Sequence, residues 1–277
     1  MLWKYFINFI KDSIREIIQI FLLIFCIAIP SIFDFEKVIE TVLNGDHITL
    51  EYIKYYYLMS LGNLVVGFLL AGFVLYQYIR ASNKNVIFNS GNLYHDKPYV
   101  WYWFSSKILG YKKCNLILVP IYIQYKLIIN DTFEEYPFDE AIFPTKKCHV
   151  YVNRSLNKQG FVLNEINLII QDTYPISDNQ IPTNMKANYT ISIIRNRDYL
   201  GERIYCEELI DKVVEEIRGL NGNVILNIFS TTNPKNTYGI VKKAICIANR
   251  GNIRGVNVFQ QDDKGIRAFA PKSYKVI

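Results

Sequence analysis

Two long apolar runs near the N-terminus dominate the pattern of hydrophobic and polar positions along the chain. They occupy about residues 17–33 and 57–79, and the second run carries no charged residue. A bilayer core requires about 20 mostly apolar helical residues, so both runs are predicted to be transmembrane helices. Helical spacing of Ile7, Ile10 and Ile14, beside Trp3, further predicts an interfacial helix that leads into the first span.

The charges that flank these runs predict how the chain lies in the membrane. Lys4, Lys11 and Arg15 precede the first span, and Arg80 and Lys84 follow the second, whereas the loop between the spans is mainly acidic. The positive-inside rule then predicts a two-pass membrane protein with both termini in the cytoplasm. A cleaved signal peptide is disfavoured, because no small-residue cleavage site follows the first run and a second span does.

Small residues in the second span leave two interpretations open. Gly67 and Ala71 lie four residues apart, a spacing that lets membrane helices approach closely and would support self-association. The alternative is that glycine is simply common in membrane helices. Neither apolar run contains an ionisable residue, which disfavours a transporter path or a proton relay.

Charge and cysteine content narrow the partners of the remaining chain. The whole chain has 31 Lys and Arg and 25 Asp and Glu, and residues 1–80 contain six of the basic and seven of the acidic residues. Residues 81–277 therefore carry a net charge of +7. Such a domain suits anionic headgroups or an anionic soluble ligand, although a solvated basic surface is the commonest explanation for such an excess. Five cysteines without a C-x-x-C pair, and only three histidines, predict free thiols in a reducing cytoplasm, no metal site and no cofactor.

Beyond the membrane domain (residues 1–80), the pattern predicts three further segments. An aromatic connector covers residues 81–113, a β-rich segment covers 114–186, and a Rossmann-like domain covers 187–277. In the β-rich segment, strands are predicted at 115–130, with a break at Pro120, at 148–153 and at 161–171, with a hairpin turn at 157–160.

The last segment alternates strand and helix patterns. Strands are predicted at 189–195, 223–229, 254–260 and 265–269, and helices at 202–219 and 235–249. The resulting order β-α-β-α-β-β implies right-handed crossovers and a parallel, Rossmann-like sheet. The predicted fold is therefore a two-helix transmembrane anchor followed by a cytosolic α/β domain.

Ligands of open α/β sheets bind outside the carboxyl ends of the strands, so two loops are candidate sites. One follows the second of these strands and is rich in hydroxyl and amide groups, with a lysine that adds charge; the other supplies two arginines for phosphate and a tyrosine for stacking. The candidate ligand-binding residues are Ser230, Thr231, Thr232, Asn233, Lys235, Asn236, Arg195, Arg197 and Tyr199. An ordinary helix cap at Thr232 or Asn233 and a solvent-facing first loop are the alternatives.

Catalytic motifs are missing from the sequence. Neither loop contains a Walker A or G-x-G-x-x-G pattern, and no G-x-S-x-G or H-E-x-x-H sequence occurs. We therefore expect a protein that is not an enzyme. Two other classes stay open: a membrane scaffold that recruits a protein partner, with an exposed aromatic patch near residues 101–104, and a membrane-tethered nucleotide-processing enzyme.

The stretch Val224–Ser230, continued by Thr231-Thr-Asn-Pro-Lys-Asn-Thr237 and a helix, resembles the strand–polar loop–helix of CARF and SAVED domains. Together with the two spans, it makes the chain similar to membrane effectors of bacterial antiphage systems such as CBASS and type III CRISPR. The resemblance implies an effector of the bacterial inner membrane that binds a cyclic oligonucleotide, forms a homo-oligomer and disrupts the lipid bilayer, without direct binding of nucleic acid. A SAVED domain has two CARF-like halves and this chain has length for one, which implies either a site completed by a dimer or a different kind of sensor.

Overall fold

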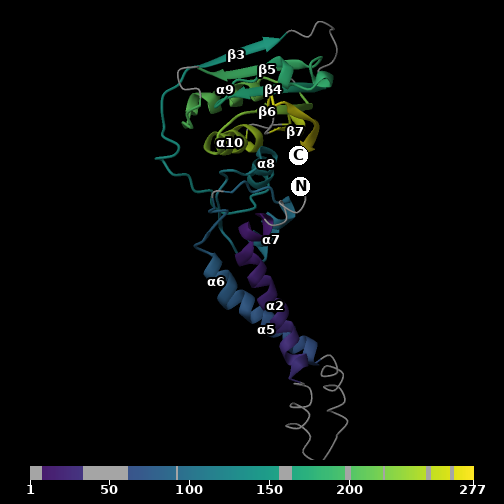
Figure 1. Cartoon of the computed structure of the whole chain (residues 1–277). Helices are drawn as coiled ribbons and strands as arrows, with labels where there is room; N and C mark the ends of the chain where they lie inside the picture. Colours follow the sequence, from purple (N-terminus) through teal and green to yellow (C-terminus); the bar gives the residue numbers. More distant parts are fainter. Residues whose placement is uncertain are drawn as a thin grey trace, which may run out of the picture. The chain divides into compact units, whose positions relative to one another are not determined.

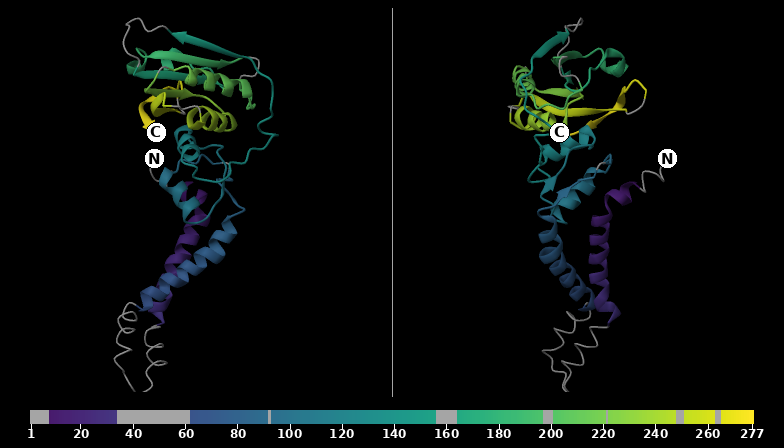
Figure 2. Two further views of the ribbon diagram at one scale, coloured as in Figure 1. Left: turned by 180° about the vertical axis from the view of Figure 1, so that it is seen from behind. Right: turned by 60° about the vertical axis from the view of Figure 1, so that its left-hand side comes forward.

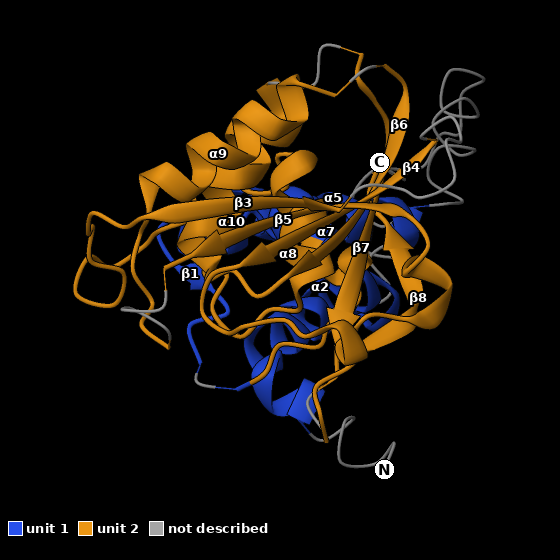
Figure 3. Ribbon diagram, turned by 90° about the horizontal axis from the view of Figure 1, so that it is seen from above, with its two compact units in different colours: residues 1–93, 103–113 blue, residues 94–102, 114–277 orange. Residues whose placement is uncertain are grey.

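The computed structural model describes residues 8–33, 62–91, 93–155, 164–196, 201–220, 222–247, 251–262 and 265–277. The chain divides into two compact units (Figure 3): unit 1 is Met1–Leu93 with Trp103–Lys113, and unit 2 is Tyr94–Tyr102 with Cys114–Ile277. Several sequence predictions lie outside the described residues: the loop at 34–56, the turn at 157–160, Arg197 and Tyr199.

Unit 1 contains the two predicted spans as neighbouring helices (Figures 1 and 2). The first is α2 (Ile14–Ile32), and the second runs continuously through α5 (Gly62–Val74), the π-helical turn η1 (Leu75–Ile79) and α6 (Arg80–Asn83). Both are long and apolar enough to cross a membrane. Large apolar side chains along both helices are exposed, as lipid-facing residues are: Ile18, Phe21, Leu22, Ile24, Phe25, Leu64, Val65, Phe68, Leu69 and Phe73.

The small residues of the second span face α2 of the same chain. Gly67 and Ala71 are buried, and a Cβ atom placed on Gly67 would lie 2.4 Å from the backbone oxygen of Ile27. The helices also share a polar contact near one end, where the side-chain amides of Gln19 and Asn83 exchange hydrogen bonds of 2.9 and 3.0 Å. The small-residue face therefore serves packing inside the chain.

The segment between the spans and the sheet contains short elements. They are β1 (Ile87–Phe88), α7 (Tyr99–Lys107) and β2 (Lys113–Cys114). The aromatic cluster at 101–104 lies on α7 with mixed burial: Tyr102 is fully buried and donates its hydroxyl to the backbone oxygen of His95 at 3.0 Å, whereas Trp103 is exposed. The aromatic patch at this position is thus only partly exposed.

A mixed sheet organises unit 2. The described strands are β3 (Val150–Ser155), β4 (Glu165–Gln171), β5 (Tyr189–Arg195), β6 (Val224–Ser230), β7 (Ile253–Gln261) and β8 (Phe269–Lys275), in the order β3-β5-β4-β6-β7-β8. The four inner strands are parallel to one another, and the two outer strands, β3 and β8, pair antiparallel with their neighbours. The strands predicted in 114–186 and in 187–277 thus belong to a single sheet.

The two faces of the sheet are covered differently (Figures 1 and 2). One face carries the helices α8 (Ile121–Ile129), α9 (Glu207–Arg218) and α10 (Pro234–Ile240), the last continued by the π-helical η5 (Val241–Ile247). The other face carries the segment between β4 and β5, with η2 (Asp178–Gln180) and η3 (Thr183–Met185). An apolar cluster lies beneath that segment and contains Ile169, Ile176, Ile181, Phe229, Phe259 and Phe269.

Several predictions need correction. Residues 121–129 form the helix α8 and not a strand. Most of its side chains are buried, and the packing of these side chains outweighs the strand preference of the β-branched residues. The predicted hairpin of the strands at 148–153 and 161–171 is wrong, since β5 lies between β3 and β4. The last strand, predicted at 265–269, is instead β8 at Phe269–Lys275. Free thiols are also wrong for Cys148 and Cys206, which form a disulfide with Cα atoms 6.2 Å apart.

Candidate functional site

The carboxyl ends of the parallel strands meet at one edge of the sheet. From β4 the chain crosses to β5 on one side, and from β5 it returns through α9 to β6 on the other side of β4. A strand order that reverses in this way opens a crevice outside the strand ends, where ligands of open sheets bind. Three polar residues mark that edge: Asp172 follows β4, and Arg195 and Ser230 end β5 and β6.

A buried ion pair lies at the centre of this edge. Arg195 and Asp172 have fully buried side chains, and Nε of the arginine lies 2.8 Å from Oδ1 of the aspartate. The guanidinium also donates hydrogen bonds to the backbone oxygens of Asp172, at 3.1 and 2.8 Å, and of Glu202, at 2.9 Å. Burial raises the pKa of the Asp172 carboxyl, and the charge of Arg195 opposes that shift. Arg195 therefore joins strand ends and is not exposed to a ligand.

Asparagine side chains complete the coordination of this carboxylate. Oδ2 of Asp172 accepts from the backbone N–H and the side-chain amide of Asn233, each at 3.0 Å, and from the side-chain amide of Asn236 at 2.9 Å. Asn233 is also the N-cap of α10, because its Oδ1 accepts from the backbone N–H of Asn236 at 3.0 Å. Both asparagines donate to the backbone oxygen of Ile204, so the α10 loop is tied to the residues that precede α9.

The hydroxyl groups of the same loop bond mainly to one another and to the backbone. Ser230, Thr232 and Thr237 form a chain of contacts, with 2.8 Å between the first two hydroxyl oxygens and 2.7 Å between the last two. Thr231 donates to the backbone oxygen of Tyr174 at 2.7 Å. Lys235 points elsewhere, with Nζ 3.4 Å from the Glu140 carboxylate. The predicted polar run is thus a buried network that fixes the loop.

A cavity of about 190 Å³ opens beside this network. Its polar lining comes from the strand-end loops and the segment before α9: Thr173, Tyr174, Gly201, Arg203, Thr232 and Asn233. Its remaining wall is formed by Pro234 and by the segment that enters α8, through Ile117, Leu118 and Gln124. All of the described residues that line the cavity belong to unit 2.

Two polar side chains that line the cavity have a group without a hydrogen-bond or ion-pair partner among the described residues. Gln124 is 6% exposed and donates Nε2 to the backbone oxygen of Val119 at 2.8 Å, while its oxygen Oε1 has no partner among the described residues. Arg203 is exposed at the cavity, and within the described parts of the chain no hydrogen bond or ion pair engages its guanidinium. The edge therefore offers an unpaired acceptor on the buried wall and an unpaired cation near solvent.

The sequence predictions and the cavity overlap in part. Thr232 and Asn233 line it, whereas Arg195, Ser230 and Asn236 are buried in the network. Sequence reasoning did not select Gln124, Tyr174 or Arg203. The strand-end rule would have found Tyr174 had the strand at 161–171 been placed in the parallel sheet, but no pattern in the sequence marks Gln124, since α8 was predicted as a strand.

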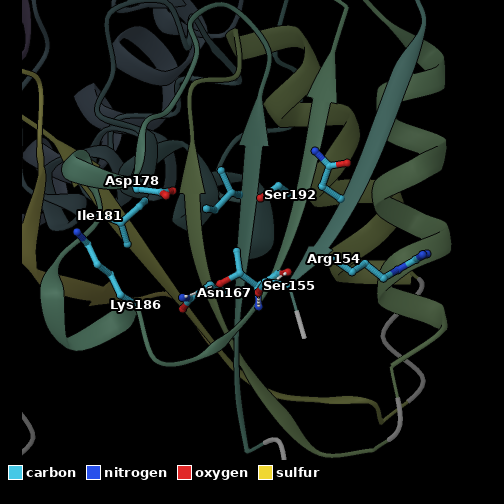
Figure 4. Close-up of a pocket in the computed structure, with 10 residues that line it drawn as sticks. Arg154, Ser155, Asn167, Asp178, Ile181, Lys186 and Ser192 are labelled. Atoms are coloured by element: carbon cyan, nitrogen blue, oxygen red, sulfur yellow. Dashed lines mark hydrogen bonds between the residues drawn. The ribbon is translucent and has the colours of Figure 1, made fainter. Parts of the chain in front are cut away.

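A second cavity, of about 480 Å³, lies over the sheet face opposite α9 (Figure 4). Hydroxyl and amide side chains of β3, β4 and β5 floor it, including Ser155, Asn167 and Ser192, and Asp178 and Lys186 stand at one side. Arg154 points away from it and pairs with Glu216 of α9 at 2.5 Å.

Among the described residues, no group of three His, Cys, Asp or Glu side chains is close enough to hold a metal ion.

A family model described as the SMODS- and ubiquitin system-associated 2TM effector domain matches residues 2–277. A search of curated proteins gave no match.

Proposed function

We propose that this chain, which belongs to the family of SMODS- and ubiquitin system-associated 2TM effector domains, binds a signalling nucleotide at the carboxyl edge of its sheet. Membership makes it a two-pass membrane effector in nucleotide-signalling defence. The ligand, the assembly and the orientation are the proposal: a cyclic oligonucleotide binds unit 2 on the cytoplasmic side of the inner membrane, and the chain then oligomerises and disrupts the bilayer without catalysing a reaction.

The cavity at the strand ends is the observation that carries the proposal. It lies at the crevice where ligands of open sheets bind, and it combines the exposed guanidinium of Arg203 with the amide oxygen of Gln124, neither of which has a partner among the described residues. The net positive charge of residues 81–277 supports an anionic ligand. The parallel core of the sheet is also the arrangement on which a Rossmann-like, CARF-like or SAVED-like relationship would rest.

Activation requires that the ligand bind the assembled state more tightly than the resting state, since equal affinity would shift nothing. The resting state has a defined helix pair, because Gly67 packs against Ile27 within one chain. We therefore place self-association on the lipid-facing surfaces of α2 and α5, or on unit 2, and not on the face that Gly67 and Ala71 occupy.

The test uses the full chain in lipid nanodiscs and in dye-loaded vesicles. Equilibrium binding of radiolabelled cyclic di-, tri- and tetranucleotides is expected to identify a ligand, and the same ligand is expected to release dye from vesicles. Arg203→Gln is expected to weaken binding about tenfold, the loss of one charge-assisted contact. Arg254→Gln is the matched control, because Arg254 is an exposed arginine near the amino end of β7, at the opposite edge of the sheet.

The outcomes separate the remaining classes. Failure of every nucleotide to bind the folded chain would overturn the proposal and favour a scaffold that recruits a protein partner. Release of a hydrolysed or cyclised product during incubation would instead favour a nucleotide-processing enzyme. Binding without dye release would retain the sensor and reject membrane disruption by the chain alone.

A further inference from the structure

We infer that the cavity beside the α10 loop holds a nucleobase of the signalling nucleotide, and that the phosphates remain outside it at Arg203. This inference rests on the proposed function and assigns the parts of the ligand within the site. It follows from which lining groups are still free to bond, from the volume of the cavity and from the aromatic ring on its wall.

Most polar groups of the lining are already committed to the fold. The Thr232 hydroxyl contacts Ser230 and Thr237, and the Asn233 amide donates to Asp172 and Ile204. Thr173, similarly, donates its hydroxyl to the backbone oxygen of Thr231. A ligand that used these groups would have to break a buried network, which costs far more than a new hydrogen bond returns.

The group left over on the buried wall is an acceptor. Oε1 of Gln124 has no partner in the described structure, and a buried polar atom without a partner calls for an explanation. Gln124 lines the cavity while its Nε2 stays bonded to the Val119 oxygen, so Oε1 is the group of this side chain that is left for a ligand. An amide oxygen takes an N–H donor, such as the amine or ring N–H of a base, and it repels phosphate oxygens.

Shape and surface agree with a base. The cavity of about 190 Å³ is smaller than the ~300–1,000 Å³ of pockets that enclose a whole ligand, so it holds one part of a dinucleotide or larger molecule. Tyr174 lines it and is 49% exposed. The guanidinium of Arg267 lies over one face of its ring, 5.1 Å from the centroid, so a base would stack on the opposite face; Ile117 and Pro234 supply apolar wall. The guanidinium of Arg203, exposed and unpaired among the described residues, is suited to the phosphates outside.

The experiment separates base contacts from phosphate contacts by their response to salt. Cyclic di-AMP, cyclic di-GMP, cyclic GMP-AMP, cyclic UMP-AMP and cyclic tri-AMP are titrated onto the full chain in nanodiscs at several salt concentrations. For a probe that binds, Gln124→Leu and Tyr174→Ala are each expected to weaken affinity about tenfold and to leave its salt dependence unchanged. Arg203→Gln is expected to weaken affinity and to flatten its salt dependence.

Three controls keep the result interpretable. Gln124→Glu retains an acceptor at the same position, and Arg254→Gln removes an exposed arginine at the opposite sheet edge. Thermal unfolding of each variant checks the fold, and Tyr174→Ala tests the cavity at a half-exposed position if Gln124→Leu fails to fold. Gln124→Glu is expected to bind the probe more tightly than Gln124→Leu does.

The contrary results are distinct. Wild-type affinity in both Gln124→Leu and Tyr174→Ala would overturn the base assignment and leave the proposed function intact. Tighter binding by Gln124→Leu, together with competition by pyrophosphate, would place a phosphate in the cavity instead. Failure of all five probes to bind would overturn this inference and the proposed function together.

Discussion

At the scale of single residues, the ion pair of Asp172 and Arg195 decides the geometry of the candidate site. Both side chains are fully buried, and their hydrogen bonds connect the ends of β4 and β5 with the loop that leads into α10. A buried pair gives little net stability relative to apolar residues, but it costs heavily when one partner is removed. Its value here is therefore positional, since it fixes the wall on which the cavity is built.

Removal of the Arg195 guanidinium is expected to destabilise the fold. Arg195→Met leaves the Asp172 carboxylate buried without its counter-charge, and we expect the free energy of unfolding to fall by about 3–5 kcal/mol. Urea-induced unfolding of the full chain in detergent micelles, followed by circular dichroism, measures the change. The double variant Asp172→Leu with Arg195→Met is expected to be more stable than Arg195→Met alone. Equal midpoints for Arg195→Met and wild type would contradict the role of the pair.

A second residue-scale prediction concerns alkaline pH. Burial, with Tyr274 and Asp96 nearby, raises the pKa of Tyr122 from the ordinary 10.0 to about 12, and its ring stacks on that of Tyr274 with centroids 3.7 Å apart. The folded chain holds this proton more tightly than the unfolded chain does. Stability is therefore fully present below pH 10 and falls as the pH rises from 10 toward 12.

Tyr122→Phe keeps the ring and removes the titrating group. Its unfolding midpoint in urea is expected to fall less steeply than that of wild type between pH 10 and 12. Tyr151→Phe is the control, because Tyr151 is 57% exposed on β3. Parallel pH curves for Tyr122→Phe and wild type would show that Tyr122 titrates normally.

The candidate site also shows what sequence could foresee about individual residues. The run Ser230–Asn233 was correctly placed at the end of a strand, because continuous apolar strands and cap residues leave strong local patterns. The sequence alone could not predict whether these polar groups bind a ligand or one another, because both arrangements need the same residue types. Only the partners decide, and Asp172, the main one, lies about 60 residues earlier in the chain.

At the scale of elements, α8 and the two spans illustrate when pattern alone suffices. The spans were predicted because length and apolarity in a membrane leave only a helix as a solution. Residues 121–129 have a strand-like composition, yet they fold as a helix after Pro120, which precedes the first helical residue and needs no N–H partner there. Short apolar runs stay ambiguous until their tertiary contacts are known.

The packing of α2 against α5 yields an element-scale prediction. A Cβ on Gly67 would lie 2.4 Å from the Ile27 oxygen, whereas a Cβ on Gly72 would meet nothing within 4 Å. Gly67→Ala is therefore expected to destabilise the helix pair by about 1–3 kcal/mol, and Gly72→Ala to leave its stability unchanged or slightly higher. Titration with SDS from mixed micelles, followed by near-ultraviolet circular dichroism, measures both variants. The same midpoint for both would mean that Gly67 does not lie against Ile27.

At the scale of the whole molecule, membership in a 2TM effector family and two exposed apolar helices establish a two-pass membrane protein. Which side of the membrane carries the sheet determines whether a cytoplasmic nucleotide can reach the cavity. Cationic residues on the outer flanks of both spans and acidic residues in the loop between them predict the cytoplasmic side. The Cys148–Cys206 disulfide favours the opposite side, because disulfides are rare in a reducing cytoplasm, so the orientation needs a direct test.

A native cysteine makes this orientation testable. Cys246 is free and exposed, whereas Cys26 and Cys114 are free but buried, so a membrane-impermeant maleimide is expected to react with Cys246 alone among the three. In intact spheroplasts we expect no labelling of the wild-type chain, and we expect labelling once the membrane is permeabilised. Cys246→Ser is expected to abolish that signal, and Asn44→Cys, in the loop between the spans, is expected to label without permeabilisation. Labelling of Cys246 in intact spheroplasts would put the sheet outside the cytoplasm, where a nucleotide made inside the cell could not reach its cavity.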